Sequence, residues 1–312
     1  MTTDFIKAIK NQDLKAVRHA PKSDLHNHAM MGGKLKSMEK FLGNKLEKFK
    51  NGSQGVMGIN YWLENVYRPL FNIPGAFKAA VDAAFIQAKS DGVSILEMSV
   101  DAFMARLFNI KPEEVASTLT ASHKAIAPEI DFRPELGFSR ALPLRTILPC
   151  VEPFLEMNYF RSIDIYDIED AQPVENFKEL YRFAKHQGIK CKAHAGEFGD
   201  AESVRKAVEV LGLDEVQHGI GAADSPEVMK WLSANRISLN VCPASNIALK
   251  RVKLYQVHPI RILFDHGVNV TVNTDDVMLF NVGNSEQYLK LYTSKLFSAE
   301  ELDTIRKNGL GN

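Results

Sequence analysis

The feature of this sequence that most constrains its fold is a repeated alternation between short apolar runs and longer helical patterns. Strands that are joined through helices pair in parallel, because each helix returns the chain to the end of the sheet at which the preceding strand began. The alternation therefore predicts an α/β fold with a parallel sheet. The eight runs with strand character are residues 23–28, 93–100, 132–139, 160–165, 189–194, 215–218, 237–242 and 268–273.

The helical patterns between these runs have recognisable ends. Ser225 before Pro226 is typical of an N-cap followed by a first-turn proline. Ser298 with Glu301 matches a capping box, which begins a final helix that runs to about Arg306. The clearest patterns predict helices at residues 77–90, 112–127, 174–187, 203–211, 226–234 and 259–266.

Eight strand–helix units in about 250 residues have the size and pattern of a (β/α)₈ TIM barrel. The competing α/β fold is an open doubly wound sheet, which would place a glycine-rich phosphate loop after the first strand. Residues 30–33, Met-Met-Gly-Gly, do not match such a loop. We expect residues 1–312 to form a single barrel domain, with the insertion 32–74 after the first strand as a helical lid on the C-terminal face.

The charge balance and the cysteines limit the partners and the compartment. Lys plus Arg and Asp plus Glu both number 38, and no long run of one sign favours nucleic acid or a membrane surface. The three cysteines form no CxxC pair, and neither a signal-peptide core nor a membrane-spanning apolar stretch is present. We expect a cytoplasmic protein that acts on a small molecule; the sequence does not indicate its oligomeric state.

Unusual polar residues fall at the C-terminal ends of the expected strands. His26 and His28 end the first strand, and a barrel brings all such ends to one mouth, where active sites lie. The two histidines are two positions apart, so both side chains point to the barrel interior, where paired imidazoles suit a divalent transition metal. By itself such a pair is about as often a packing feature as a metal site.

His194 at the end of the fifth strand and Asp275 after the eighth add two further candidate ligands. Three imidazoles and one carboxylate form a zinc shell that leaves room for water. Glu197 follows His194 by three residues, which places a carboxyl group beside the metal, and Asp276 is free for substrate. Taken singly, a buried histidine is about as often a packing residue as a ligand, and a Thr-Asp-Asp sequence is more often a turn or an N-cap than a functional site.

Six short motifs together resemble the adenosine and adenine deaminases of the amidohydrolase superfamily. They occur in the family's order from about residue 22 onward. The motifs are DLHNH at 24–28, HAGE at 194–197, HG at 218–219, CPASN at 242–246, HPI at 258–260 and NTDD at 273–276. The resemblance implies one zinc ion per chain, bound by His26, His28, His194 and Asp275.

The reaction that the resemblance implies is hydrolytic deamination of an adenosine- or adenine-type purine, or of a related aminated heterocycle. Zinc lowers the pKa of its bound water toward ~7, which gives hydroxide at neutral pH. The resemblance assigns His218 and Asp276 to accept a proton from that water and to orient the water for attack. It assigns a neutral Glu197 to protonate the ring. Ammonia is the second product. We expect structural roles for Ser245, Asn246 and His258, because these residues suit loop and helix caps.

The positions that would contact substrate depart from the family pattern. Adenosine deaminases carry an acidic residue for the ribose two positions after the histidine pair, where this chain has Met30. The family's glycine after the fourth strand is also not evident in SIDIYDIED. The family's Arg-x-Ser-Pro pattern after the second strand is replaced by Ser-Val-Asp-Ala at residues 99–102. The expected substrate contacts are Asp276, Gly196, Met30, Tyr166 and Asp101, with Arg140 as a further candidate.

Two other functions fit parts of the pattern. A binuclear-metal hydrolase that cleaves an ester, lactone or amide would carry a modified lysine, usually on the fourth strand, where FRSIDI offers none. Lys192 shares the inward parity of His194 but has no assigned role. A binding protein on the same scaffold would have no need of Glu197 beside a metal.

Overall fold

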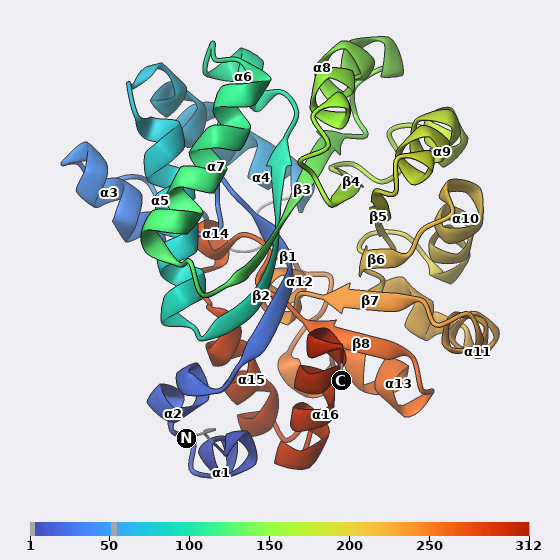
Figure 1. Cartoon of the computed structure of the whole chain (residues 1–312). Helices are drawn as coiled ribbons and strands as arrows, with labels where there is room; N and C mark the ends of the chain where they lie inside the picture. Colours follow the sequence, from blue (N-terminus) through green and yellow to red (C-terminus); the bar gives the residue numbers. More distant parts are fainter. Residues whose placement is uncertain (1–3, 51–54, 312) are drawn as a thin grey trace.

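Eight parallel strands form the centre of the molecule, and helices surround them (Figure 1). The computed structural model describes residues 4–50 and 55–311. Each strand pairs with the next one in the sequence, in the order β1 to β8. The strands are β1 Lys22–His28, β2 Val93–Asp101, β3 Asp131–Ser139, β4 Ser162–Tyr166, β5 Lys190–Ala195, β6 Glu215–His218, β7 Ser238–Val241 and β8 Asn269–Val272.

The barrel closes between β8 and β1 through a short, irregular seam. Asn27 and Asp275 form an isolated parallel bridge, and the backbone N–H of Asp275 donates to the carbonyl of His26 at 2.9 Å. The side chain of Asn273 accepts from the backbone N–H of Leu25 at 2.7 Å. The predicted (β/α)₈ barrel is thus confirmed, and its seam lies directly beside the candidate metal ligands.

The outer layer contains all six of the predicted helices, with ends that differ by up to two residues. The 174–187 pattern divides into a 3₁₀ turn, Val174–Phe177, and the helix α9. The outer helices are α5 Ala76–Ser90, α7 Pro112–Ile126, α8 Leu144–Glu156, α9 Lys178–His186, α10 Ala201–Leu211, α11 Pro226–Ala234, α13 Ile260–Asp265, α15 Asn284–Thr293 and α16 Ala299–Leu310. Shorter helices are α1 Phe5–Lys10, α2 Leu14–His19, α6 Met104–Leu107, α12 Pro243–Ala248 and α14 Val277–Phe280.

Helix ends follow the local sequence. The Ser225 side chain accepts from the backbone N–H of Val228 at 3.3 Å at the start of α11. Ser298 and Glu301 form the expected capping box of α16, in which the serine accepts at 3.2 Å and the glutamate at 2.8 Å. Such side-chain acceptors satisfy backbone donors that have no partner within the helix.

Strand β2 shows how the barrel separates its two faces. Leu96 and Val100 are fully buried beneath the helices, as parallel strands covered on both faces require. The alternate residues Glu97, Ser99 and Asp101 point inward, because Glu97 contacts Lys192 inside the barrel and the other two line the cavity at the mouth. The barrel interior is therefore polar from its floor to its mouth.

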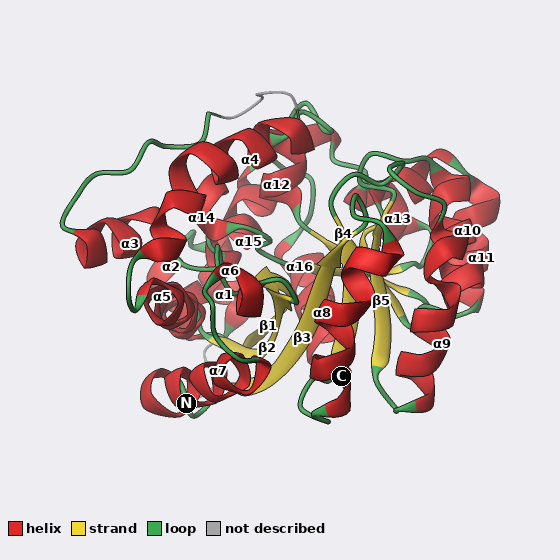
Figure 2. Cartoon of the chain, turned by 90° about the horizontal axis from the view of Figure 1, so that it is seen from above, coloured by secondary structure: helices red, strands yellow, loops and turns green. Residues whose placement is uncertain are grey.

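The insertion after β1 is helical and covers the C-terminal face, as predicted. It contains α3 Leu35–Leu42, α4 Val56–Trp62, a π-helical turn Leu63–Tyr67 and a 3₁₀ turn Arg68–Asn72. In Figure 2, α4 lies on the same side of the barrel as α12 and α14, which follow β7 and β8. The Tyr67 hydroxyl donates to the Met30 carbonyl at 2.5 Å, which ties the insertion to the end of β1.

No helix within residues 4–50 and 55–311 combines the length and the apolar character that crossing a membrane requires.

Candidate metal centre and active site

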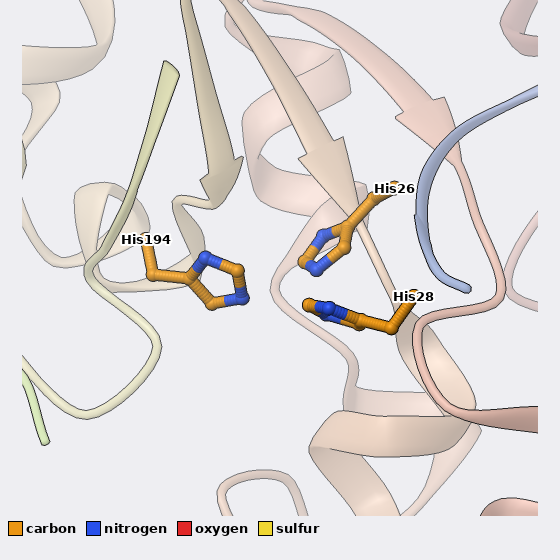
Figure 3. Close-up of side chains that lie close together, drawn as sticks. All are labelled: His26, His28 and His194. Carbon is orange, nitrogen blue, oxygen red and sulfur yellow. The ribbon is translucent and has the colours of Figure 1, made fainter. Parts of the chain in front are cut away.

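Three histidine side chains from two strands point toward one another at the barrel mouth (Figure 3). The ring centroids of His26 and His194 are 4.6 Å apart, those of His26 and His28 are 5.4 Å apart, and those of His28 and His194 are 5.9 Å apart. One nitrogen of each ring lies within 4.8 Å of one nitrogen of each of the others. The convergence follows from the same-face parity of His26 and His28 and from the C-terminal position of His194 on β5.

Asp275 joins this cluster from the loop after β8. Its Oδ1 lies 3.3 Å from His28 Nε2 and 3.8 Å from His26 Nε2. Asp275 has a φ of 59°, in the left-handed region that non-glycine residues rarely adopt. Burial opposes ionisation of Asp275, but the hydrogen bond from His28 and the neighbouring imidazoles hold its pKa below the usual range. The carboxylate is thus available as a negatively charged ligand.

The residues present fit a transition metal such as zinc. His26 Nε2 is buried and makes no hydrogen bond to any described residue, although it faces the other candidate ligands. A buried polar atom without a partner is rare, and a metal would satisfy it. Burial is the main cause that lowers the pKa of His26 well below its ordinary value, and the nearby His194 acts in the same direction. The imidazole is therefore neutral and can donate a lone pair to a metal.

Three further side chains hold the cluster from behind. Asp164 on β4 lies 3.0 Å from His194 Nδ1, which leaves the other ring nitrogen for a metal. Cys242 Sγ lies 3.3 Å from His26 Nδ1, and Asn246 Nδ2 lies 3.2 Å from His218 Nδ1. Asp164 and Cys242 were not predicted from the sequence as partners of the histidines. The inward parity of Asp164 and its place two residues before the end of β4 were the available signals.

Glu197, His218 and Asp276 lie around the same cluster. His218 Nε2 lies 3.6 Å from Glu197 Oε2 and 3.8 Å from Asp275 Oδ2. One carboxylate oxygen each of Glu197 and Asp276 is buried without a hydrogen bond to the described part of the chain. The structure therefore brings together all seven residues predicted for the metal and for catalysis, while their roles stay predictions.

Burial controls the protonation of these three groups. It raises the pKa of Glu197 well above the ordinary value, with the charge of Asp275 acting in the same direction. Burial and Asp275 also raise the pKa of Asp276 to about 7, and burial lowers the pKa of His218 to about 3. A divalent cation at the cluster would favour the ionised carboxylates again, since it adds a nearby opposite charge.

A cavity of about 300 Å³ opens above the cluster. Three of the predicted substrate contacts, Met30, Asp101 and Tyr166, line it beside Asp276, whereas Gly196 is not among its lining residues. Arg140 is placed differently from the expectation, because it lines a separate cavity and its Nε donates to the Gln172 carbonyl at 2.8 Å. Arg140 directly follows β3, and its hydrogen bond to Gln172, in the loop after β4, holds its side chain beside that separate cavity.

Tyr166 and Asp101 form a pair in the cavity wall, in which the tyrosine hydroxyl donates to the carboxylate. The Tyr166 ring packs against His28, with centroids 5.6 Å apart. Gly137 makes room for this ring, since a Cβ there would lie 2.4 Å from Tyr166 Cε1. The pair is therefore a fixed part of the cavity next to the metal cluster.

The loop that carries Glu197 is held from two sides by groups of opposite charge. The Glu169 carboxylate accepts from the backbone N–H groups of Glu197 and Gly199, at 2.8 and 2.6 Å. Arg251 donates to the carbonyl of Glu197 at 2.8 Å, and its guanidinium lies over the Phe198 ring. Neither residue was predicted from the sequence, because neither lies in a motif and both bind backbone atoms.

Comparisons with known proteins agree with this fold. The model of a family described as adenosine deaminase matches residues 62–312. A protein of Treponema pallidum provisionally named adenosine/adenine deaminase is 30% identical over 298 residues, which cover 95% of this chain and 100% of that protein.

Two solved structures have a similar fold. The adenine deaminase of Arthrobacter aurescens superposes with a TM-score of 0.82 at 23% identity, over 93% of each chain. A zinc-bound amidohydrolase of Burkholderia ambifaria superposes with a TM-score of 0.82 at 22% identity, over 100% of this chain and 88% of that one. At these identities the likeness shows the barrel fold alone.

Proposed function

This chain belongs to the adenosine deaminase family, and from that premise we propose that it is a metal-dependent hydrolase that deaminates a purine-type amine. The observation that carries the proposal is the convergence of four candidate metal ligands and three proton-transfer candidates at the barrel mouth, where all of them except His26 line one cavity. The family's reaction exchanges the ring amino group for oxygen from water and releases ammonia. The chain is thus a deaminase that acts on cyclic amidines.

The proposed metal is a single zinc ion held by His26, His28, His194 and Asp275. The three histidines form one candidate ligand group, and Asp275 lies 3.3 Å from His28. Three nitrogens and one carboxylate oxygen suit zinc. When bound there, zinc supplies Lewis acidity and lowers the pKa of water to ≈ 7. The zinc-bound amidohydrolase with the same fold supports this choice of metal.

The chain's own groups would position and move protons around that ion. Glu197 is buried beside His218, lines the cavity and has one carboxylate oxygen without a hydrogen bond to the described residues, so it suits proton donation to a ring nitrogen. His218 is neutral because of its burial, and Asn246 fixes the orientation of its ring. His218 and Asp276 are therefore placed to accept a proton from the attacking water and to aim its oxygen.

The two-metal alternative gains no support from the barrel interior. Lys192 points inward as its parity predicts, but its ammonium contacts Glu97 and lies 2.8 Å from Glu135 on the floor of the barrel. It also donates to the Leu25 carbonyl at 3.0 Å. Since these partners occupy the three hydrogens of the ammonium, Lys192 is a structural cation and not a bridging ligand.

The test is ammonia release by the purified, zinc-loaded protein. The panel contains adenine, adenosine, N6-substituted and phosphorylated forms, pterins and pyrimidines, with Glu197→Gln as the inactive control. We expect release from at least one purine by the unmodified protein and none above background by the variant. Absence of ammonia across the whole panel would overturn the proposed function, and two metals per chain with ester or amide cleavage would favour the binuclear alternative.

A further inference from the structure

The wall of the cavity away from the metal cluster is mostly apolar. It combines side chains from the insertion, from the residues after β1, from the segment after β2 and from the end of α12. The chemistry takes place at the metal, so the part of a substrate distal to its amino group faces this wall. Its apolar residues are Met30, Met31, Val56, Ile59, Leu63, Phe71, Met104, Leu107 and Leu249.

Most polar groups of this wall are already paired with one another. Asp167 accepts from Ser139 at 2.6 Å and from Asn60 of α4 at 3.2 Å, and the Tyr166 hydroxyl donates to Asp101. Hydrogen bonds to a sugar would have to compete with these contacts. A substrate gains little by offering hydroxyl groups to side chains that are satisfied.

The charges of the wall are unfavourable to a phosphate. Arg68 is the only lysine or arginine among the described lining residues, and both oxygens of Glu64 bind its guanidinium at 2.6 Å. Asp101 and Asp167 add further acidic groups. A phosphorylated substrate would therefore meet three carboxylates and a single cation that is already paired with one of them.

We propose, on the basis of the deaminase function proposed above, that the substrate is an unphosphorylated purine-type amine with an apolar substituent distal to its amino group. The apolar wall binds that substituent, and the Glu64–Arg68 pair together with the acidic residues discriminates against phosphate. The selectivity of this chain thus comes from desolvation of an apolar group and not from recognition of a sugar or a phosphate.

The experiment compares kcat/KM of the zinc-loaded protein for adenine, 9-propyladenine, adenosine and adenosine 5′-phosphate. We expect 9-propyladenine to exceed adenine and adenosine by roughly tenfold and adenosine 5′-phosphate by about 100-fold or more. A higher kcat/KM for adenosine or its phosphate would overturn the inference and leave the deaminase function intact. Lack of ammonia from all four compounds and from the wider purine panel would instead overturn the function itself.

A charge variant tests the rejection of phosphate. Glu64→Gln frees Arg68, so kcat/KM for adenosine 5′-phosphate should rise about fivefold relative to that for 9-propyladenine. The matched control is Glu179→Gln, which removes the partner of Arg182 in an exposed pair on α9, outside the cavity. An unchanged ratio in Glu64→Gln, or an equal rise in Glu179→Gln, would overturn the role of the Glu64–Arg68 pair.

Discussion

Two of the candidate ligands, His28 and His194, have a raised pKa, and the shift of His28 is large. Burial acts to lower its pKa, but Asp276 and Asp275 outweigh burial and raise it to about 10. Its ordinary value is near 6.5, so the metal-free folded chain keeps a proton on His28 between pH 6.5 and about 10. A metal must displace this proton, because only the neutral imidazole is a ligand.

We therefore predict that zinc affinity of the metal-free protein rises with pH, by up to about tenfold per pH unit, until His28 loses its proton. Calorimetric titration with zinc at pH 8.5, in buffers that differ in ionisation enthalpy, measures the protons released. His28→Gln should release one proton fewer per zinc than the unmodified protein. Equal proton release by the two proteins would contradict the assignment of the proton to His28.

Glu197 allows catalysis and metal binding to be separated. Its carboxylate lies beside His218, and the expected metal shell is complete without it. Glu197→Gln should lower kcat by about 10²–10⁴-fold, the usual contribution of a general acid, with unchanged zinc content. Ammonia release and metal analysis of the same preparation check both parts. A variant that loses its zinc would show that Glu197 is a ligand after all.

At the scale of elements, the residues at the strand ends could be predicted from the sequence, whereas helix α8 and the contacts between loops could not. The period-2 pattern placed His26 and His28 on one face, and the barrel placed His194 beside them. Helix α8 escaped prediction because Pro149 and Pro153 interrupt its pattern, yet its apolar side is buried against the barrel. Tertiary packing therefore outweighed the local cost of proline in this helix.

The loop clamp on Glu197 leads to a prediction for an element. Glu169→Gln replaces one of two charged acceptors of backbone N–H groups by a donor, so the loop loses a charge-assisted hydrogen bond. We expect kcat to fall by roughly 10–100-fold, since small displacements of a catalytic group are costly. Zinc content should not change.

The control for this variant is Glu175→Gln, which breaks an exposed ion pair with Lys206 and leaves the loop untouched. Steady-state kinetics of the two variants make the comparison. If Glu169→Gln retains full kcat, the carboxylate does not position Glu197.

At the scale of the whole molecule, the floor of the barrel contains a buried charge cluster that unites several strands. Lys192 on β5 is fully buried between Glu97 on β2 and Glu135 on β3, and Glu215 on β6 lies 3.8 Å from its Nζ. Burial alone would lower the pKa of Lys192, but Glu135 and Glu97 outweigh it and raise the pKa well above the ordinary value. The lysine stays charged and neutralises the carboxylates around it.

Lys192→Met would leave buried carboxylates without their counter-charge. We expect the free energy of unfolding to fall by about 3–5 kcal/mol, as is typical when one partner of a buried pair is removed. Urea unfolding measures the change, with the exposed Lys206→Met as a control that should leave stability unaltered. Adding Glu97→Gln and Glu135→Gln should recover part of the loss; a Lys192→Met protein as stable as the original would contradict the role of the cluster.

The sequence by itself determined the alternation of strands and helices, the barrel and the residues at the strand ends. These features depend on periodicity and on helix caps, which are interactions between residues close together in the chain. The family motifs added the roles expected of His26, His28, His194 and Asp275.

Only the tertiary structure decided which side chains from distant segments meet. It joined Asp164 to His194, Glu169 to the Glu197 loop and Lys192 to its carboxylates, and it closed the insertion over an apolar cavity. Each of these contacts depends on long-range packing of segments whose own sequences carry no sign of their partner. The candidate metal ligands could therefore be predicted from the sequence, whereas the side chains that support them and the lining of the cavity depend on the assembled barrel.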